Sequence, residues 1–274
     1  MNACRSTLFA AALCCSTFAV AGSITLQWDA TPWNPNPAAG PFGYSVTTGG
    51  STYTGSVAPD RYHGTITAVN GVDPSTIGQG LPSVPEGLFT FCYELTQYFY
   101  TGETVVYEVV PATTPGSVTA YTLDFLGAVN AYLGGGATAW LTPSSPAMTA
   151  NLAAAIQLGI WETLYDVGNP FDIANDANRG NFYLTSGQLG TGAGSIGGYL
   201  TTITGMMAAT ADLSPNAVAR LSNTSDPRQN GQGAQDQITA VFPTSRLTVP
   251  EPGTLALLAI TGFVALAVRR RSKA

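Results

Sequence analysis

The stretch "AAAIQLGIWETLYD", Ala153 to Asp166, places a glutamine inside an apolar helix. At helical spacing Gln157 shares a face with Ala153, Ile160 and Trp161, which are side chains expected in a core. A buried primary amide without hydrogen-bond partners costs roughly 1 to 3 kcal/mol. The fold must therefore satisfy the amide of Gln157, or the chemistry of that amide must be altered.

The N-terminus has the three parts of an export signal. Arg5 supplies a positive charge, an apolar run follows, and Ala19-Val20-Ala21 is a small-x-small cleavage site in front of Gly22. We therefore expect 1–21 to be a signal peptide and 22–249 to be the exported ectodomain.

The C-terminus, 250–274, also has three parts: a short proline element, an apolar segment and a basic cluster. They are Pro250, Glu251 and Pro252, then 254–268, then 269–273 with Arg269, Arg270 and Arg271. The apolar segment predicts a short transmembrane helix whose basic end stays in the cytoplasm.

This tripartite C-terminus resembles the PEP-CTERM sorting signal of Gram-negative bacteria. The resemblance implies processing by an exosortase, a membrane-embedded transpeptidase-like enzyme that cleaves near the Pro-Glu-Pro. The chain would be anchored in the inner membrane before cleavage and would reach the cell surface or the exopolysaccharide matrix afterwards. A plain single-pass anchor is the alternative.

The composition of 22–249 narrows the classes of partner and of chemistry. Cys92 is its single cysteine, so an internal disulfide is impossible, and an unpaired cysteine is unusual in an exported protein. Five arginines face fifteen acidic residues, a net charge of −10, and lysine is absent. This charge argues against nucleic acid or anionic lipid as a partner.

The pattern of the ectodomain predicts an α+β fold, a β-rich scaffold of sandwich or barrel type with a helical insert. β-branched and aromatic runs cut by turn residues predict strands over about 23–110 and again over 236–248. Ala-rich segments with helical spacing occupy about 120–212. Ser145 followed by Pro146 predicts the start of the helix that contains Gln157.

Cys92 lies in "LFTFCYEL", where alternation puts Leu88, Thr90 and Cys92 on one face of a strand and Phe91 and Tyr93 on the other. "FCYELTQ" followed by "AAAIQLGIWETLYD" resembles the thioester domains of bacterial surface proteins. That family pairs an aromatic-Cys strand with a hydrophobic-Gln-hydrophobic-x-hydrophobic-Trp helix.

The resemblance implies that Cys92 is the thioester cysteine and Gln157 the acyl donor, with Trp161 as the aromatic residue one turn beyond. We expect Phe91, Tyr93 and Trp161 to keep water away from the bond. The partner would be an amine, from a lysine or a polyamine, captured covalently during adhesion or matrix cross-linking. Such a protein is a single-turnover binder rather than an enzyme, and neither a cofactor nor a metal is expected.

Two other functions fit the same residues. The protein can be a non-covalent structural component of the matrix with an inert thiol at Cys92. Alternatively, Cys92 and the only histidine, His63, can form the dyad of a hydrolase, although His63 lies in a loop-like stretch.

Overall fold

A computed structural model of the chain describes residues 22–29, 41–71, 87–136, 139–141, 148–166, 173, 180–223 and 234–240. These residues all belong to one unit that spans 21–243. The predicted signal peptide and the whole of 250–274, with its sorting element and predicted membrane helix, lie outside them. No helix among the described residues has the length and apolarity needed to cross a membrane.

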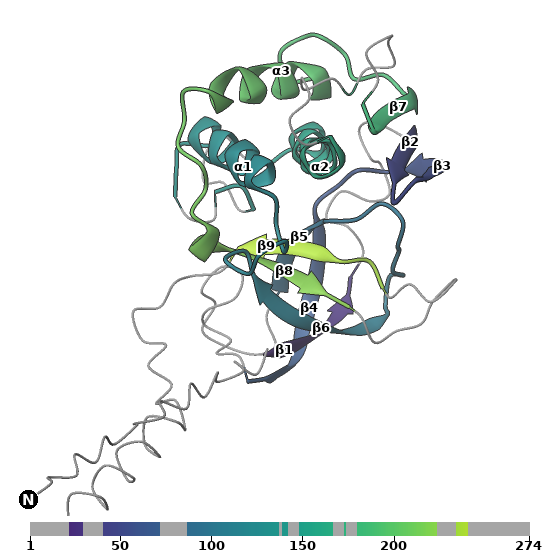
Figure 1. Cartoon of the computed structure of the whole chain (residues 1–274), viewed down its shortest axis with the longest axis vertical. Helices are drawn as coiled ribbons and strands as arrows, with labels where there is room; N and C mark the ends of the chain where they lie inside the picture. Colours follow the sequence, from purple (N-terminus) through teal and green to yellow (C-terminus); the bar gives the residue numbers. More distant parts are fainter. Residues whose placement is uncertain are drawn as a thin grey trace, which may run out of the picture. The chain divides into compact units, whose positions relative to one another are not determined.

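Six antiparallel strands close into a barrel, as Figure 1 shows in its lower half. Around the barrel they are β1 (Ser23–Trp28), β4 (Tyr62–Asn70), β5 (Gly87–Cys92), β9 (Gln237–Ala240), β8 (Val218–Ser222) and β6 (Thr104–Pro111). The predicted β-rich scaffold is thus confirmed, and it is of the barrel type. The last strand, β9, lies between β5 and β8 and is needed for closure.

Three other strands form a separate sheet in the order β3-β2-β7. They are β2 (Phe42–Thr48), β3 (Ser51–Val57) and β7 (Phe182–Ser186). The hairpin between β2 and β3 turns at Gly49 and Gly50, both with positive φ. The sequence predicted only helices over 120–212, so β7 is a departure from that prediction.

Three helices pack beside the barrel: α1 (Ala120–Tyr132), α2 (Ala150–Tyr165) and α3 (Ile196–Met207) (Figure 1). Each begins after a hydroxyl side chain that accepts a hydrogen bond from the first turn, namely Thr119, Thr149 and Ser195. The predicted start of α2 at Ser145 and Pro146 is therefore wrong. The helix begins later, where the hydroxyl of Thr149 accepts from the N–H of Leu152.

Helix α2 is the central element of the helical part, because every residue from Leu152 to Thr163 is buried. It contacts α1, α3, β2 and β7. A helix enclosed on all sides is apolar nearly all round, and among the residues from Leu152 to Thr163 only Gln157, Glu162 and Thr163 are polar. At Gly159 a Cβ atom would come within 2.0 Å of the Phe125 ring, so the absence of a side chain lets α1 approach α2.

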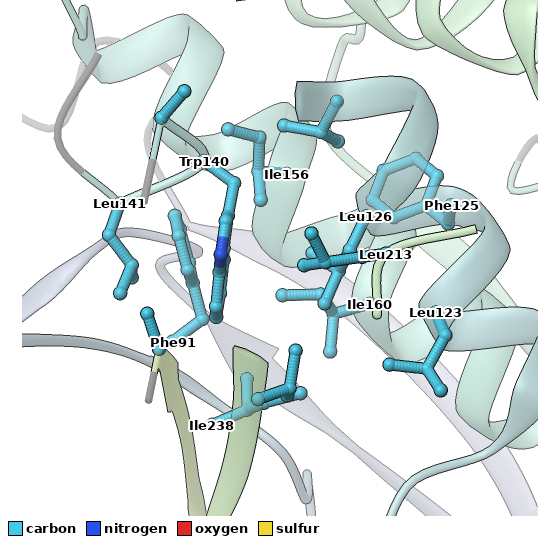
Figure 2. Packing of buried hydrophobic residues seen from close by; sticks show 14 of the residues in the cluster. Phe91, Leu123, Phe125, Leu126, Trp140, Leu141, Ile156, Ile160, Leu213 and Ile238 are labelled. Carbon is cyan, nitrogen blue, oxygen red and sulfur yellow. The ribbon is translucent and has the colours of Figure 1, made fainter. Parts of the chain in front are cut away.

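The helices share an apolar core with the outer face of the barrel. Phe91 from β5 stacks on Trp140 at a ring-centroid distance of 6.1 Å, and Ile238 from β9 joins the same cluster (Figure 2). Figure 2 shows Ile156 and Ile160 of α2 on the helical side of this core. The barrel interior is a second core, built around Leu26, Trp28 and other residues. The C-terminal end of β5 thus packs against α2 within this apolar core.

Candidate functional site

Cys92 and Gln157 are in direct contact. Cys92 is the last residue of β5 and Gln157 lies in the middle of α2. The backbone N–H of Cys92 donates to Oε1 of Gln157 at 2.7 Å, and Nε2 of Gln157 donates to the carbonyl oxygen of Cys92 at 2.8 Å. The two residues are 65 positions apart in the chain, and tertiary packing alone brings them together.

This pair of hydrogen bonds fixes the carboxamide of Gln157 against the backbone of Cys92. Gln157 is 0% exposed and Cys92 is 1% exposed, so water does not reach either group. The buried amide of Gln157 therefore has one hydrogen-bond partner for its oxygen and one for its nitrogen. The geometry also places the carboxamide against the backbone of Cys92, the only cysteine among the described residues.

The sulfur of Cys92 has its own polar neighbours on the barrel side. Nε2 of Gln237 donates to it at 3.6 Å, and the Tyr62 side chain also forms a hydrogen bond with the thiol. Burial raises the pKa of the Cys92 thiol well above its usual range, while the hydrogen bonds from Gln237 and Tyr62 act in the opposite direction. The thiol is therefore neutral in the folded protein at pH 7.

Gln237 is a second buried glutamine that the sequence reading missed. It lies opposite Cys92 in the β5–β9 pairing. Its Oε1 accepts from the Thr90 hydroxyl at 2.9 Å, and its Nε2 also donates to the carbonyl oxygen of Gln235 at 3.1 Å. The available signal was alternation in "QITA", which puts Gln237 and Thr239 together on one face of a strand.

The three predicted shielding residues fall into two groups. Trp161 is fully buried and belongs to the same cluster as Cys92, with its ring 6.3 Å from that of Phe182. Phe91 and Tyr93 are equally buried but belong to the cluster on the other face of β5, against the helices. Trp161 thus shares a cluster with Cys92, whereas Phe91, within β5, and Tyr93, directly after it, belong to another cluster.

The strand end beyond Cys92 is held by an ion-pair network. Arg220 bonds Asp236 through Nε at 2.6 Å and Glu94 through a guanidinium nitrogen at 3.0 Å. The N–H of Tyr93 donates to the carbonyl oxygen of Asp236 at 2.8 Å. Burial, with the charge of Asp236 as a smaller contribution, raises the pKa of Glu94. These contacts position the segment after β5 and leave the Cys92–Gln157 contact itself uncharged.

His63 does not face Cys92. On β4 it pairs with Phe89, while its neighbour Tyr62 pairs with Thr90 on the face that carries the thiol. Nδ1 of His63 lies 2.7 Å from a carboxylate oxygen of Asp29, and its ring packs on Phe89. Alternation therefore puts the imidazole on the face of β4 opposite to the thiol, so the arrangement does not pair His63 with Cys92.

Within the described ranges, no three histidine, cysteine or acidic side chains come together as a metal site would require. The groups around Cys92 are a thiol, two carboxamides, a phenol and backbone amides, and the charge of the buried Asp60 carboxylate contributes to the raised pKa of the thiol.

One comparison with known proteins gives a match, at the C-terminus. Residues 248–271 match the PEP-CTERM protein-sorting motif. This is a signal of exported proteins that are held at the membrane by their C-terminus and processed by an exosortase. The motif matches the predicted tail, with Pro250, Glu251, Pro252 and the arginine cluster inside it. No curated protein and no solved structure matches the chain.

Proposed function

We propose that this exported, exosortase-processed protein forms an internal thioester between Cys92 and Gln157 and uses it to capture amine-bearing partners at the cell surface or in the exopolysaccharide matrix. The observation that supports this most directly is the pair of hydrogen bonds that hold the Gln157 carboxamide on the backbone of Cys92. Holding a nucleophile and its target in contact can lower a barrier by about 7 to 11 kcal/mol.

The donor to the Gln157 carbonyl also suits acyl chemistry. In a thiol attack the carbonyl oxygen becomes an oxyanion, and a backbone N–H at 2.7 Å is the kind of group that stabilises such a charge. The thiol of Cys92 is neutral at rest, so its proton has to leave during the attack. Gln237 donates to the same sulfur and favours the thiolate that forms on the way.

The atoms balance without a further reactant. Sγ of Cys92 attacks Cδ of Gln157, the C–N bond breaks, and the amide nitrogen leaves as ammonia with the thiol proton. A partner's primary amine then attacks the same carbon, the C–S bond breaks, and the released proton returns to the sulfur. The product is an amide between Gln157 and the partner, with Cys92 again a free thiol.

The composition of residues 22–249 supports the presence of a thioester that persists in the folded protein. Residues 22–249 contain no lysine, so one copy offers no side-chain amine to the thioester of another copy. The arginines do not replace lysine as nucleophiles, because a guanidinium stays protonated. Burial of Cys92 and Gln157 would also protect the bond from hydrolysis.

A second candidate is a non-covalent structural protein of the matrix. The same two hydrogen bonds favour it, because they satisfy the Gln157 amide and join α2 to β5 without any reaction. In this case Cys92 is a buried thiol that only fills space.

Intact mass separates the two candidates. The wild-type chain, exported with its own signal and purified from cell envelopes, is expected to weigh one ammonia less than its sequence. The Cys92→Ala variant, processed in the same way, should show the full mass. Methylamine should add to the wild type alone and expose one thiol. A wild-type chain of full mass, with one thiol that reacts after denaturation, would identify the non-covalent protein instead.

A further inference from the structure

A cavity of about 690 Å³ lies near the site, and its lining includes Tyr62, whose side chain interacts with the Cys92 thiol. Five of its lining residues are aromatic: Tyr44, Tyr53, Tyr62, Tyr98 and Phe99. The others among the described residues are small, polar or aliphatic, and Asp29 is the only charged one. We call this cavity the aromatic cleft.

Tyr62 belongs both to the aromatic cleft and to the surroundings of the thiol. It lines the cleft, and its ring meets Phe99 edge-on at 5.1 Å. It also sits opposite Thr90 on β5, on the face of the strand that carries Cys92, and its hydroxyl forms a hydrogen bond with the sulfur. Tyr62 therefore contacts both the open cleft and the surroundings of the buried Cys92 thiol.

Only weak interactions keep the side chain of Tyr62 in place. Its hydroxyl donates to the carbonyl oxygen of Ala58 at 3.2 Å, and its residue is half-buried rather than enclosed. Such a hydrogen bond contributes about 1 kcal/mol, and the interaction with the Cys92 sulfur and the edge contact with Phe99 add to it, so turning the ring aside breaks a few weak interactions. By contrast, Trp161 and Leu158 on the α2 side of Cys92 are fully buried in a packed cluster.

The lining of the cleft suits a cation on an aliphatic chain. Ammonium groups are attracted to the faces of aromatic rings, and the carboxylate of Asp29, 43% exposed, adds a negative charge. None of the described lining residues is a lysine or an arginine that would repel it. A reacting amine must be uncharged, so the charge that the cleft attracts is a second one, at the far end of the molecule.

We propose that the aromatic cleft is the route by which aliphatic diamines and similar cationic primary amines reach the Cys92–Gln157 bond, with Tyr62 as the side chain that controls access. This inference rests on the proposed thioester. In it, Tyr62 is a positioning residue, and Asp29 sets a preference for amines that carry a distant positive charge.

The test compares two amines of the same length. Cadaverine and n-hexylamine differ in that one ends in an ammonium and the other in a methyl group, and the rate of each is followed by the gain in mass of the full-length chain. The wild type is expected to react several-fold faster with cadaverine. Asp29→Asn should remove this preference while the ammonia deficit stays.

Three further variants and one control test the route itself. Tyr62→Ala should raise the rates of both amines, and of hydrolysis, by about tenfold, a factor equivalent to about 1.4 kcal/mol. Tyr62→Phe, which keeps the ring, should raise them less. Thr96→Trp fills the cleft and should slow both amines without restoring the lost ammonia. Tyr132→Ala, on α1 and away from the cleft, is the control and should react as the wild type does.

The outcomes distinguish the two proposals. A wild-type chain without the mass deficit overturns the thioester and this inference with it. A chain that has the deficit, but whose rates are unchanged in Tyr62→Ala and Thr96→Trp, overturns the cleft as the route and leaves the thioester standing. An equal rate for the two amines in the wild type overturns the role of Asp29.

Discussion

Two buried glutamines flank Cys92, and they hold it in different ways. Gln157, on a helix, binds the backbone of Cys92 through both ends of its carboxamide. The nitrogen of Gln237, on the neighbouring strand, donates to the sulfur, and its oxygen accepts from the Thr90 hydroxyl. Both amides are satisfied, so hydrogen bonding alone does not distinguish a structural glutamine from a reactive one.

The difference lies in what each glutamine can do when the thiol reacts. The Gln157 carbonyl is polarised by the N–H of the residue that carries the nucleophile, which suits an acyl donor. The amide N–H of Gln237 points at the sulfur and stabilises negative charge there. In the proposed thioester, the carbonyl carbon therefore belongs to the helix side, and support of the thiolate belongs to the barrel side.

The sharpest way to break this comparison is to replace each glutamine by methionine, which has a similar volume and no amide. Gln157→Met should abolish the ammonia deficit completely, whereas Gln237→Met should keep the deficit and only slow its appearance after synthesis. Intact mass read at successive times checks both, and thermal unfolding confirms that each variant is folded. A deficit that survives Gln157→Met and disappears in Gln237→Met would reverse the assignment.

The helix side also depends on how closely α1 and α2 approach. Gly159→Ala places a methyl group where the Phe125 ring lies, so we expect a loss of about 1 to 3 kcal/mol from overpacking. Gly205→Ala on α3 meets nothing within 4 Å and should instead stabilise the protein by about 0.5 to 1 kcal/mol. Denaturant unfolding of the two variants measures both effects. Equal changes in the two would show that the close approach at Gly159 is unimportant.

A smaller effect is expected on the barrel side. Thr90→Val preserves shape but removes the hydroxyl that donates to Gln237, which should cost about 1 to 3 kcal/mol, at the lower end if the amide finds water. The ammonia deficit should be unchanged, because the Gln157 contacts are untouched. The exposed Thr67→Val is the control and should stay within about 0.5 kcal/mol of the wild type. A lost deficit in Thr90→Val would mean that the two glutamines act as one unit.

The sequence predicted much of the helix side of the site, around Gln157, and little of the barrel side, around Gln237. Strand alternation around Cys92 and helical spacing around Gln157 are local periodicities, and both are confirmed by β5 and α2. Their juxtaposition followed from resemblance to a family, since periodicity does not say which face of a strand meets which helix.

The barrel partners depend on pairings between distant segments. Gln237 reaches Cys92 through a β5–β9 register that joins residues 145 positions apart, and no local pattern specifies such a register. Strand β7 was missed for a related reason, since it lies within the Ala-rich region and is held by α2. The Asp166 carboxylate at the end of that helix accepts from the N–H of Phe182 at 2.8 Å.

The position of β9 has a consequence for the timing of assembly. Secretion delivers the chain from its N-terminus, and the strand that completes the barrel ends at Ala240, eight residues before the sorting motif begins. Nearly all of the ectodomain must therefore emerge before Gln237 can cover the Cys92 sulfur. Until then the thiol is open to oxidants outside the cytoplasm, so slow translocation would lengthen the time during which Cys92 can be oxidised.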